Sequence, residues 1–171
     1  EATANQAKAD AELAATLGRT SQPAEAVTSV AQPSTRLYRL YPGADQAQVA
    51  AVLDATYRQI MVFPDGNLPE DWRLADAEQA VHYGQMTVRE FVRQLLASPA
   101  YQARFVAAYP VAKLVPIMAR QLLGRNVQDA ELQSYLEKAE EAGAMAIAEA
   151  MLGSDEYLRY FGEQGVPYRR V

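Results

Sequence analysis

From residue 45 onward, apolar side chains recur at three- and four-residue steps, the period of a helix with one buried face. The helices predicted from this period cover about 45–62, 70–83, 112–123, 128–142 and 144–152, with shorter ones that begin at Thr87, Ser98 and Ser154. Thr87 is followed three residues later by Glu90, the spacing of a capping box. Because period-two alternation is absent and β-branched residues are sparse, we predict an all-α fold without strands.

The segment Gln121–Asn126 is expected to join two helices that share one core. Gly124 stands where a left-handed C-cap would lie, a conformation that glycine adopts without a Cβ clash. In the helix before it, Pro116 is tolerated in the first turn and would kink the helix elsewhere.

The two ends of the chain differ from the middle. Residues 1–36 are Ala-rich and then rich in Thr, Ser, Gln and Pro, so we predict a flexible N-terminal extension, followed by a helical domain over 37–171. Residues 37–43 are expected to form an extended arm on that domain.

The tail 166–170 is predicted to be extended and cationic, and its deletion to weaken partner binding more than folding. Because residue 1 is Glu, we expect a fragment of a longer chain or a processed one.

A weak internal repeat runs through the predicted domain. The pattern Leu-x-Ser-x-x-Tyr-x-x-x-Phe occurs at 96–105 and again at 152–161, and 58–60 (Arg-Gln-Ile) resembles 120–122 (Arg-Gln-Leu). We favour a duplication in which neither half buries its apolar face well alone. Coincidence remains the alternative, since Ser caps and aromatic anchors are common.

Composition excludes several classes of function. The net charge of −5 argues against nucleic-acid binding, which needs clustered Lys and Arg, and against a polybasic membrane anchor. Without cysteine there is no disulfide, thiolate nucleophile or Cys-based metal site, and no apolar run approaches a membrane span. His82 is the only histidine and lacks ligand-spaced partners. The carboxylates of 128–142 share one helix face, so we predict no enzyme.

Five stretches in order carry a family resemblance. They are 55–60 (Ala-Thr-Tyr-Arg-Gln-Ile), 87–93 (Thr-Val-Arg-Glu-Phe-Val-Arg), Ser98-Pro99-x-Tyr101, 122–125 (Leu-Leu-Gly-Arg), and 154–163 with Val166-Pro167-Tyr168-x-Arg170. With them, the segment from about 45 to 170 resembles the conserved domain of phycobilisome linker polypeptides, cyanobacterial and red-algal proteins that assemble light-harvesting antennae. Residues 1–36 are not covered.

The resemblance implies a compact bundle of about six helices that catalyses nothing. It implies binding in the central hole of phycobiliprotein trimers or hexamers (phycocyanin or allophycocyanin), with other linkers as further partners, no nucleic acid and no membrane insertion. The domain would fix disc stacking and tune nearby bilins while binding none covalently, and would lie within the phycobilisome on the cytoplasmic side of the photosynthetic membrane. The resemblance does not distinguish rod, rod-core and core-membrane types. The alternative is a generic duplicated helical interaction module, unrelated to light harvesting.

Many such linkers are basic, whereas this chain is acidic, so local patches must bind the partner. The partner-binding candidates are Tyr38, Tyr41, Phe63, Trp72, Tyr83, Arg89, Arg93, Arg104, Tyr168, Arg169 and Arg170. For Phe63, Trp72 and Tyr83 an exposed contact and a core position remain equally open. Tyr57, Tyr101, Tyr135 and Tyr157 are predicted to be core residues. Arg125 could bind a partner carboxylate or a bilin propionate; we favour a structural role within the turn, tied to neighbouring carbonyls and Asp129.

Overall fold

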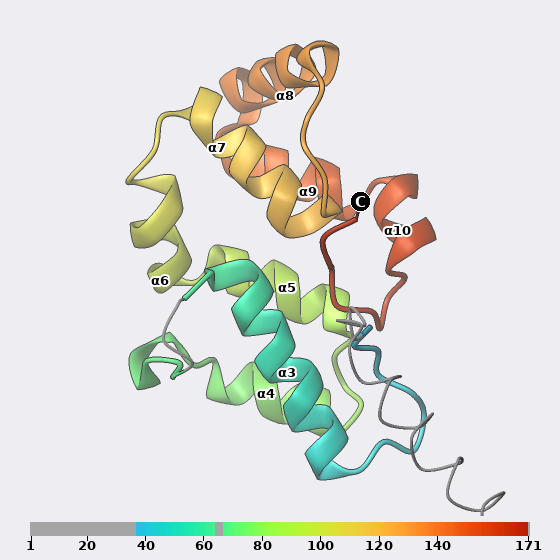
Figure 1. The fold of residues 1–171 in the computed structure, drawn as a ribbon. Coiled ribbons are helices and arrows are strands. Elements are labelled where there is room, and N and C mark those ends of the chain that lie inside the picture. The colour runs from blue at the N-terminus through green and yellow to red at the C-terminus, as the bar shows by residue number, and fades with distance from the viewer. Residues whose placement is uncertain (1–36, 64–66, 171) are drawn as a thin grey trace, which may run out of the picture. The chain divides into compact units, whose positions relative to one another are not determined.

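The computed structural model describes residues 37–63 and 67–170, so the predicted extension 1–36 and residues 64–66 and 171 lie outside the described residues. The elements are α3 (Gln46–Met61), η2 (Glu70–Trp72), α4 (Ala75–His82), α5 (Val88–Ala97), α6 (Pro99–Tyr101), η3 (Gln102–Val106), α7 (Val111–Met118), η4 (Ala119–Leu123), α8 (Asp129–Ala142), α9 (Met145–Leu152) and α10 (Asp155–Tyr160) (Figure 1). The all-α prediction is confirmed: this part of the chain contains no strand, only an isolated bridge between Arg39 and Gly165.

Local capping explains where the helices begin. The Thr87 hydroxyl accepts a hydrogen bond from the Glu90 amide at 3.2 Å, and the Glu90 carboxylate accepts one from the Thr87 amide at 2.8 Å. The predicted capping box is therefore confirmed. Asp45 and Gln48 form the same reciprocal pair at the start of α3.

The helix predicted over 70–83 is wrong as a single element. It divides into the 3₁₀ turn η2 and helix α4, with Arg73 and Leu74 between them. The Leu74 amide donates to the Tyr57 hydroxyl at 2.8 Å rather than to a carbonyl of its own helix. Such divisions give eight α-helical segments in the described residues, where about six were expected.

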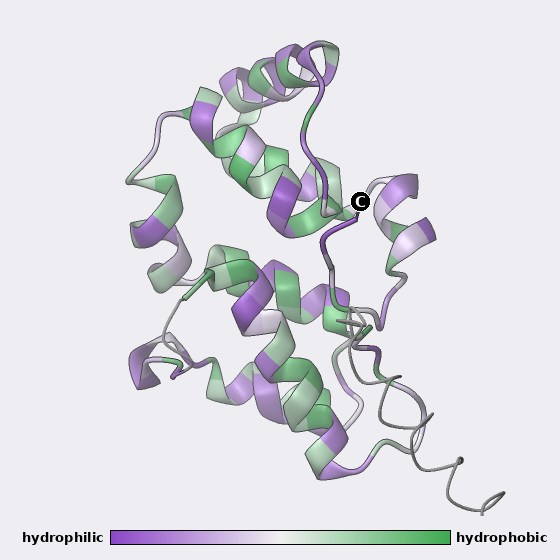
Figure 2. Cartoon of the chain, viewed as in Figure 1, coloured by the Kyte–Doolittle hydropathy of each residue, from purple (hydrophilic) through white to green (hydrophobic). Residues whose placement is uncertain are grey.

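Two groups of helices meet in one core. Helices α3, α4 and α5 contact one another, as do α7, α8 and α9, and the groups join where α5 packs on α9 and α3 on η4 (Figure 1). Tyr57, Tyr101 and Tyr157 are fully buried as predicted, whereas Tyr135 is half-buried. Hydrophobic and hydrophilic positions both occur around α8, none of whose residues is buried (Figure 2). It is therefore an outer helix.

The two copies of the Ser-Tyr-Phe pattern have the same local structure. The Ser98 hydroxyl donates to the Leu95 carbonyl at 2.6 Å and accepts from the Tyr101 amide at 3.3 Å. Ser154 repeats both bonds, to the carbonyl three residues before it and the amide three residues after it, at 2.7 and 3.1 Å. This match supports the duplication.

The arm and the tail hold each other on the domain. Leu40 donates its amide to the Gln164 carbonyl at 2.8 Å, and Val166 donates to the Tyr38 carbonyl at 2.9 Å, so the arm lies on the domain as predicted. The tail is extended, but Val166 and Pro167 are buried and Tyr168 packs edge-on against Phe161, with 5.1 Å between ring centroids. The tail is thus part of the packing, and we expect its deletion to weaken folding as well as partner binding.

Candidate binding site at the seam between the helix groups

The end of η4 lies at the seam where the two helix groups and the tail meet. Gly124 ends this helix with φ +70° and ψ +19°, so the predicted left-handed C-cap is confirmed. Glycine is required for a second reason. An added Cβ would overlap the Tyr168 carbonyl and stand 3.3 Å from the Arg170 amide nitrogen, because the tail backbone runs directly over the turn.

The last carbonyls of η4 are satisfied from outside the helix. Gln59 of α3 donates its amide nitrogen to the Arg120 and Gln121 carbonyls at 3.2 and 3.0 Å. Arg170 donates its Nε to the Leu123 carbonyl at 2.9 Å and its backbone amide to the Gly124 carbonyl at 2.7 Å. Helix ends leave such carbonyls without partners inside the helix. Here α3 and the tail supply the donors, which fixes all three segments together.

Arg125 ties the turn to α8 and α10. Its guanidinium binds Glu131 at 2.6 and 2.9 Å and Glu156 at 2.6 and 2.8 Å, and also donates to the Asn126 carbonyl at 3.0 Å. Hydrogen bonds from Arg125 hold the pKa of both carboxylates below the ordinary range, and the same bonds raise the pKa of Arg125. The favoured structural role is confirmed, although Glu131 and Glu156 replace the expected Asp129.

Arg170 completes this network. It forms a second ion pair with Glu156, and its guanidinium lies 3.8 Å from the ring centroid of Tyr160. The two acids Glu131 and Glu156 therefore offset the charges of Arg125 and Arg170.

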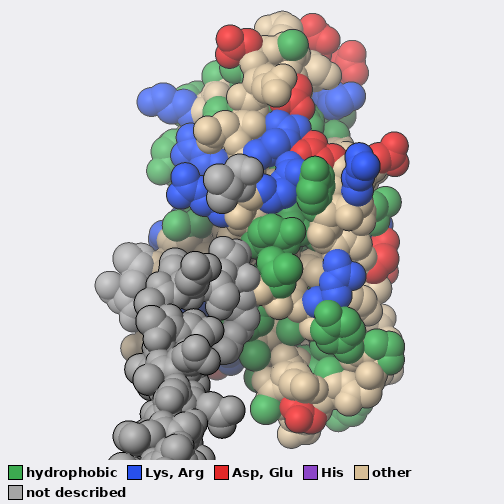
Figure 3. All heavy atoms as spheres, turned by 45° about the vertical axis from the view of Figure 1, so that its right-hand side comes forward, with side chains coloured by type: hydrophobic (Ala, Val, Ile, Leu, Met, Phe, Trp, Pro, Cys, Tyr) green, Lys and Arg blue, Asp and Glu red, His purple; other side chains and the backbone are tan. Residues whose placement is uncertain are grey.

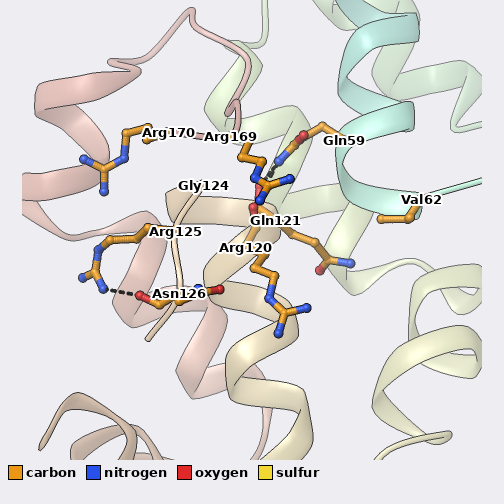
Figure 4. Close-up of a pocket in the computed structure, with 9 residues that line it drawn as sticks. All are labelled: Gln59, Val62, Arg120, Gln121, Gly124, Arg125, Asn126, Arg169 and Arg170. Carbon is orange, nitrogen blue, oxygen red and sulfur yellow. Dashed lines mark hydrogen bonds between the residues drawn. The ribbon is translucent and has the colours of Figure 1, made fainter. Parts of the chain in front are cut away.

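A pocket of about 440 Å³ opens at this seam (Figure 4). Its lining residues are Gln59, Val62, Arg120, Gln121, Gly124, Arg125, Asn126, Arg169 and Arg170. The side chains of Arg125 and Arg170 point away from those of Gln59 and Arg120 (Figure 4). Arg120 and Arg169 are exposed and form no hydrogen bond or ion pair with their side chains in the described part of the chain. The face shown in Figure 3 carries a cluster of Lys and Arg side chains.

The other predicted arginines have partners within the domain. Arg89 binds Glu163 at 2.8 Å and the Leu152 carbonyl at 2.9 Å, and Arg93 binds Glu149 at 3.0 Å. Arg104 donates to the Val62 carbonyl at 2.7 Å and lies 5.0 Å from the Trp72 ring centroid. Their role in partner binding stays a prediction. Among the predicted arginines, Arg169 is the one whose exposed side chain forms no hydrogen bond or ion pair within the described residues.

The predicted aromatic residues differ in exposure. Tyr83 is 77% and Tyr41 67% exposed, so both can contact a partner without rearrangement. Phe63 and Trp72 are half-buried and pack edge-on, with 6.4 Å between centroids. Tyr38 and Tyr168 are also half-buried. Among the predicted residues, the structure brings Phe63, Trp72 and Arg104 together.

Sequence reasoning missed Gln59, Arg120 and Gln121 as binding candidates. The signal was present, because the matched triplets at 58–60 and 120–122 are the segments that meet at the pocket. In the described ranges no group of three or more His, Asp or Glu side chains could hold a metal ion. None of the helices described there is long and apolar enough to cross a membrane.

Comparison with known proteins assigns the chain to a family. The family model described as phycobilisome linker polypeptide matches residues 44–170, nearly all of the described domain. This chain belongs to the phycobilisome linker polypeptide family. The match begins just after the arm and includes the seam, the Arg125 network and the tail.

Relatives of two kinds share this linker domain. The chain is 38% identical over 136 residues to a phycobiliprotein ApcE of Nostoc sp., covering 79% of this chain and 12% of that protein. It is 34% identical over 132 residues to a phycoerythrin-associated rod linker polypeptide of Microchaete diplosiphon, covering 75% and 45%. A phycocyanin-associated rod linker polypeptide of the same organism is 33% identical over 121 residues, covering 70% and 45%. The chain thus spans less than half the length of these relatives.

Proposed function

We propose that this domain is a non-enzymatic structural linker that binds in the central cavity of phycobiliprotein discs, organises their assembly and tunes nearby bilins for energy transfer. Membership of the phycobilisome linker polypeptide family carries the proposal. The names of two relatives add to it, because one is phycocyanin-associated and the other phycoerythrin-associated. The site of action is the phycobilisome, on the cytoplasmic side of the photosynthetic membrane.

The geometry suits a part that positions other proteins. The seam is held by hydrogen bonds that α3 and the tail donate to the end of η4 and the turn, so the domain presents its surface residues at fixed positions. Tyr41 and Tyr83 offer large exposed rings, and aromatic residues with a polar tip are enriched at protein interfaces. Rings and guanidinium groups held beside a bilin would change its local field. The chain has no cysteine thiol for attaching a bilin of its own.

Reconstitution tests this function. The full chain is mixed with phycocyanin or allophycocyanin trimers, and sedimentation velocity and bilin emission are measured. We expect larger discs and a shifted emission maximum, and weaker assembly when Tyr41 and Tyr83 are both replaced by alanine. Tyr109→Ala is the matched control, because Tyr109 is also exposed, at 42%, and was not predicted to contact a partner. If neither sedimentation nor emission changes with the unmodified chain, the linker function is wrong and a generic helical interaction module remains.

A further inference from the structure

We propose that the seam pocket is a carboxylate-binding site, in which Arg120 and Arg169 receive an Asp or Glu side chain of the partner protein. The identity of the partner as a phycobiliprotein rests on the proposed function. The pocket chemistry itself rests only on the residues described above.

The arginines that line the pocket carry two more positive charges than their acidic partners offset. Four arginines line the pocket, and two of them are paired with Glu131 and Glu156. Arg120 and Arg169 have no acid within ion-pair distance among the described residues. In a chain with net charge −5, two cations without acids that line one pocket mark a local exception.

The sequence explains why Arg120 has no acid beside it. The equivalent residue in the other half, Arg58, pairs with Asp54 one helical turn earlier at 2.9 Å. The position one turn before Arg120 is Pro116, which cannot form an ion pair. The second half therefore has the charge without the intrahelical partner.

The pocket wall favours an anion further. The side-chain nitrogen of Gln121 is buried without a hydrogen-bond partner, whereas the oxygen of the same amide accepts from the Tyr101 hydroxyl at 2.6 Å. A buried N–H group without an acceptor leaves positive potential in its surroundings. Val62, also on the wall, is 54% exposed and can cover the methylene groups of an incoming side chain.

A carboxylate matches the donor groups and the size of this pocket. A guanidinium group presents a planar fork of donors that binds both oxygens of a carboxylate, and two forks can share one acid. A pocket of about 440 Å³ admits one acidic side chain with a few waters. The anionic groups that a partner protein presents are chiefly its Asp and Glu side chains.

The first test uses glutarate as a mimic of the Glu side chain. It is titrated into the isotope-labelled full chain while NMR follows the arginine Nε–H signals. We expect saturable shifts of the Arg120 and Arg169 signals, and backbone amide shifts at Gly124 and Asn126, which line the pocket, that are at least several-fold weaker in the double variant Arg120→Gln, Arg169→Gln. Arg159→Gln is the control, because Arg159 is exposed and does not line the pocket. Shifts that do not saturate, an equal loss in the control, or tighter binding of inorganic phosphate would each overturn the carboxylate assignment.

The second test asks where the carboxylate comes from. Assembly of the double variant with phycobiliprotein discs should be roughly ten-fold weaker than that of the control, and less so in high salt. Unchanged assembly affinity with an altered emission maximum would assign the carboxylate to a bilin propionate and refute the side-chain source. If the unmodified chain binds no disc, the proposed function fails while the glutarate titration still decides the pocket chemistry.

Discussion

Replacing Gly124 with alanine separates two effects at one position, the left-handed backbone and the close approach of the tail. A left-handed conformation costs an alanine roughly 1 kcal/mol relative to glycine. The added Cβ would also stand 2.9 Å from the carbonyl carbon of Tyr168 and overlap its oxygen. Since the obstacle is backbone rather than the end of a flexible side chain, the tail must move away from the turn.

Moving the tail has a cost that the structure allows us to estimate. The two hydrogen bonds from Arg170 to the Leu123 and Gly124 carbonyls contribute about 1 kcal/mol each. The edge-on contact of Tyr168 with Phe161 contributes roughly another 1 kcal/mol. With the backbone strain, Gly124→Ala should lower the free energy of unfolding by about 4 kcal/mol.

Gly84 is the matched control, because its φ of +71° is nearly the same and an added Cβ meets nothing within 4 Å. Gly84→Ala should therefore lower the free energy of unfolding by only about 1 kcal/mol. Urea denaturation followed by far-UV circular dichroism measures both changes, with a constant m-value as the condition for comparison. Equal losses in the two variants would show that the tail does not rest on the turn, and would refute the proposed seam.

Other contacts predict further changes in the same denaturation assay. Tyr101→Phe should lower the free energy of unfolding by about 1–2 kcal/mol, since it removes a buried hydrogen bond. Tyr157→Phe should leave the free energy of unfolding unchanged, because the buried Tyr157 hydroxyl has no partner. An equal loss in the two variants would contradict this assignment. Arginine hydrogen bonds lower the pKa of Glu156, so its contribution is present above the ordinary pKa of 4.5 and is lost as the pH falls through the lowered value. Glu156→Gln should accordingly flatten the acid limb of the stability profile, and an unchanged limb would refute the link. Val62→Gly should raise the free energy of unfolding by roughly 0.5–1 kcal/mol, because a β-branched residue at φ +48° is strained; a loss would show that its side chain matters more. Deleting 166–171 should lower the melting temperature by several degrees at least, and a truncated chain that melts as before would return the tail to the status of a free arm.

Features that depend on neighbouring residues could be predicted from the sequence. The capping box at Thr87, the Ser caps and the end of η4 at Gly124 each depend on side chains within four residues. The division of the 70–83 segment could not be predicted in this way. It depends on the Tyr57 hydroxyl, which accepts a hydrogen bond from the Leu74 amide, 17 residues further along the chain.

The candidate site was less predictable for the same reason. Its walls come from the end of α3, the end of η4 and the tail, and only folding brings residues 59, 120 and 169 together. The acids that pair with Arg125 lie on two different helices, so the expected local partner Asp129 was wrong. The extended conformation of the tail was predicted correctly, but its burial was not. The Tyr168 ring packs on Phe161, and the tail backbone lies over Gly124, which has no Cβ.

The matched triplets place equivalent residues of the two halves at the same offset, and the pocket lies where they meet. Gln59 and Gln121 are equivalent, and the first donates to the backbone of the second. Val62 and Gly124 are equivalent, both are left-handed helix caps, and both line the pocket. The pocket is therefore built from two copies of one helix end.

What distinguishes the two helix ends is the segment that covers each of them. The Val62 carbonyl is met by the long side chain of Arg104, which leaves room for a Cβ and even for a branched side chain. The tail backbone lies directly over Gly124, and only glycine fits there. The tail also brings Arg169 to the pocket, where Pro116 has left Arg120 without an acid one turn earlier. The excess positive charge thus arises from the differences between two otherwise equivalent helix ends, and an acid at position 116 would offset the charge of Arg120 alone.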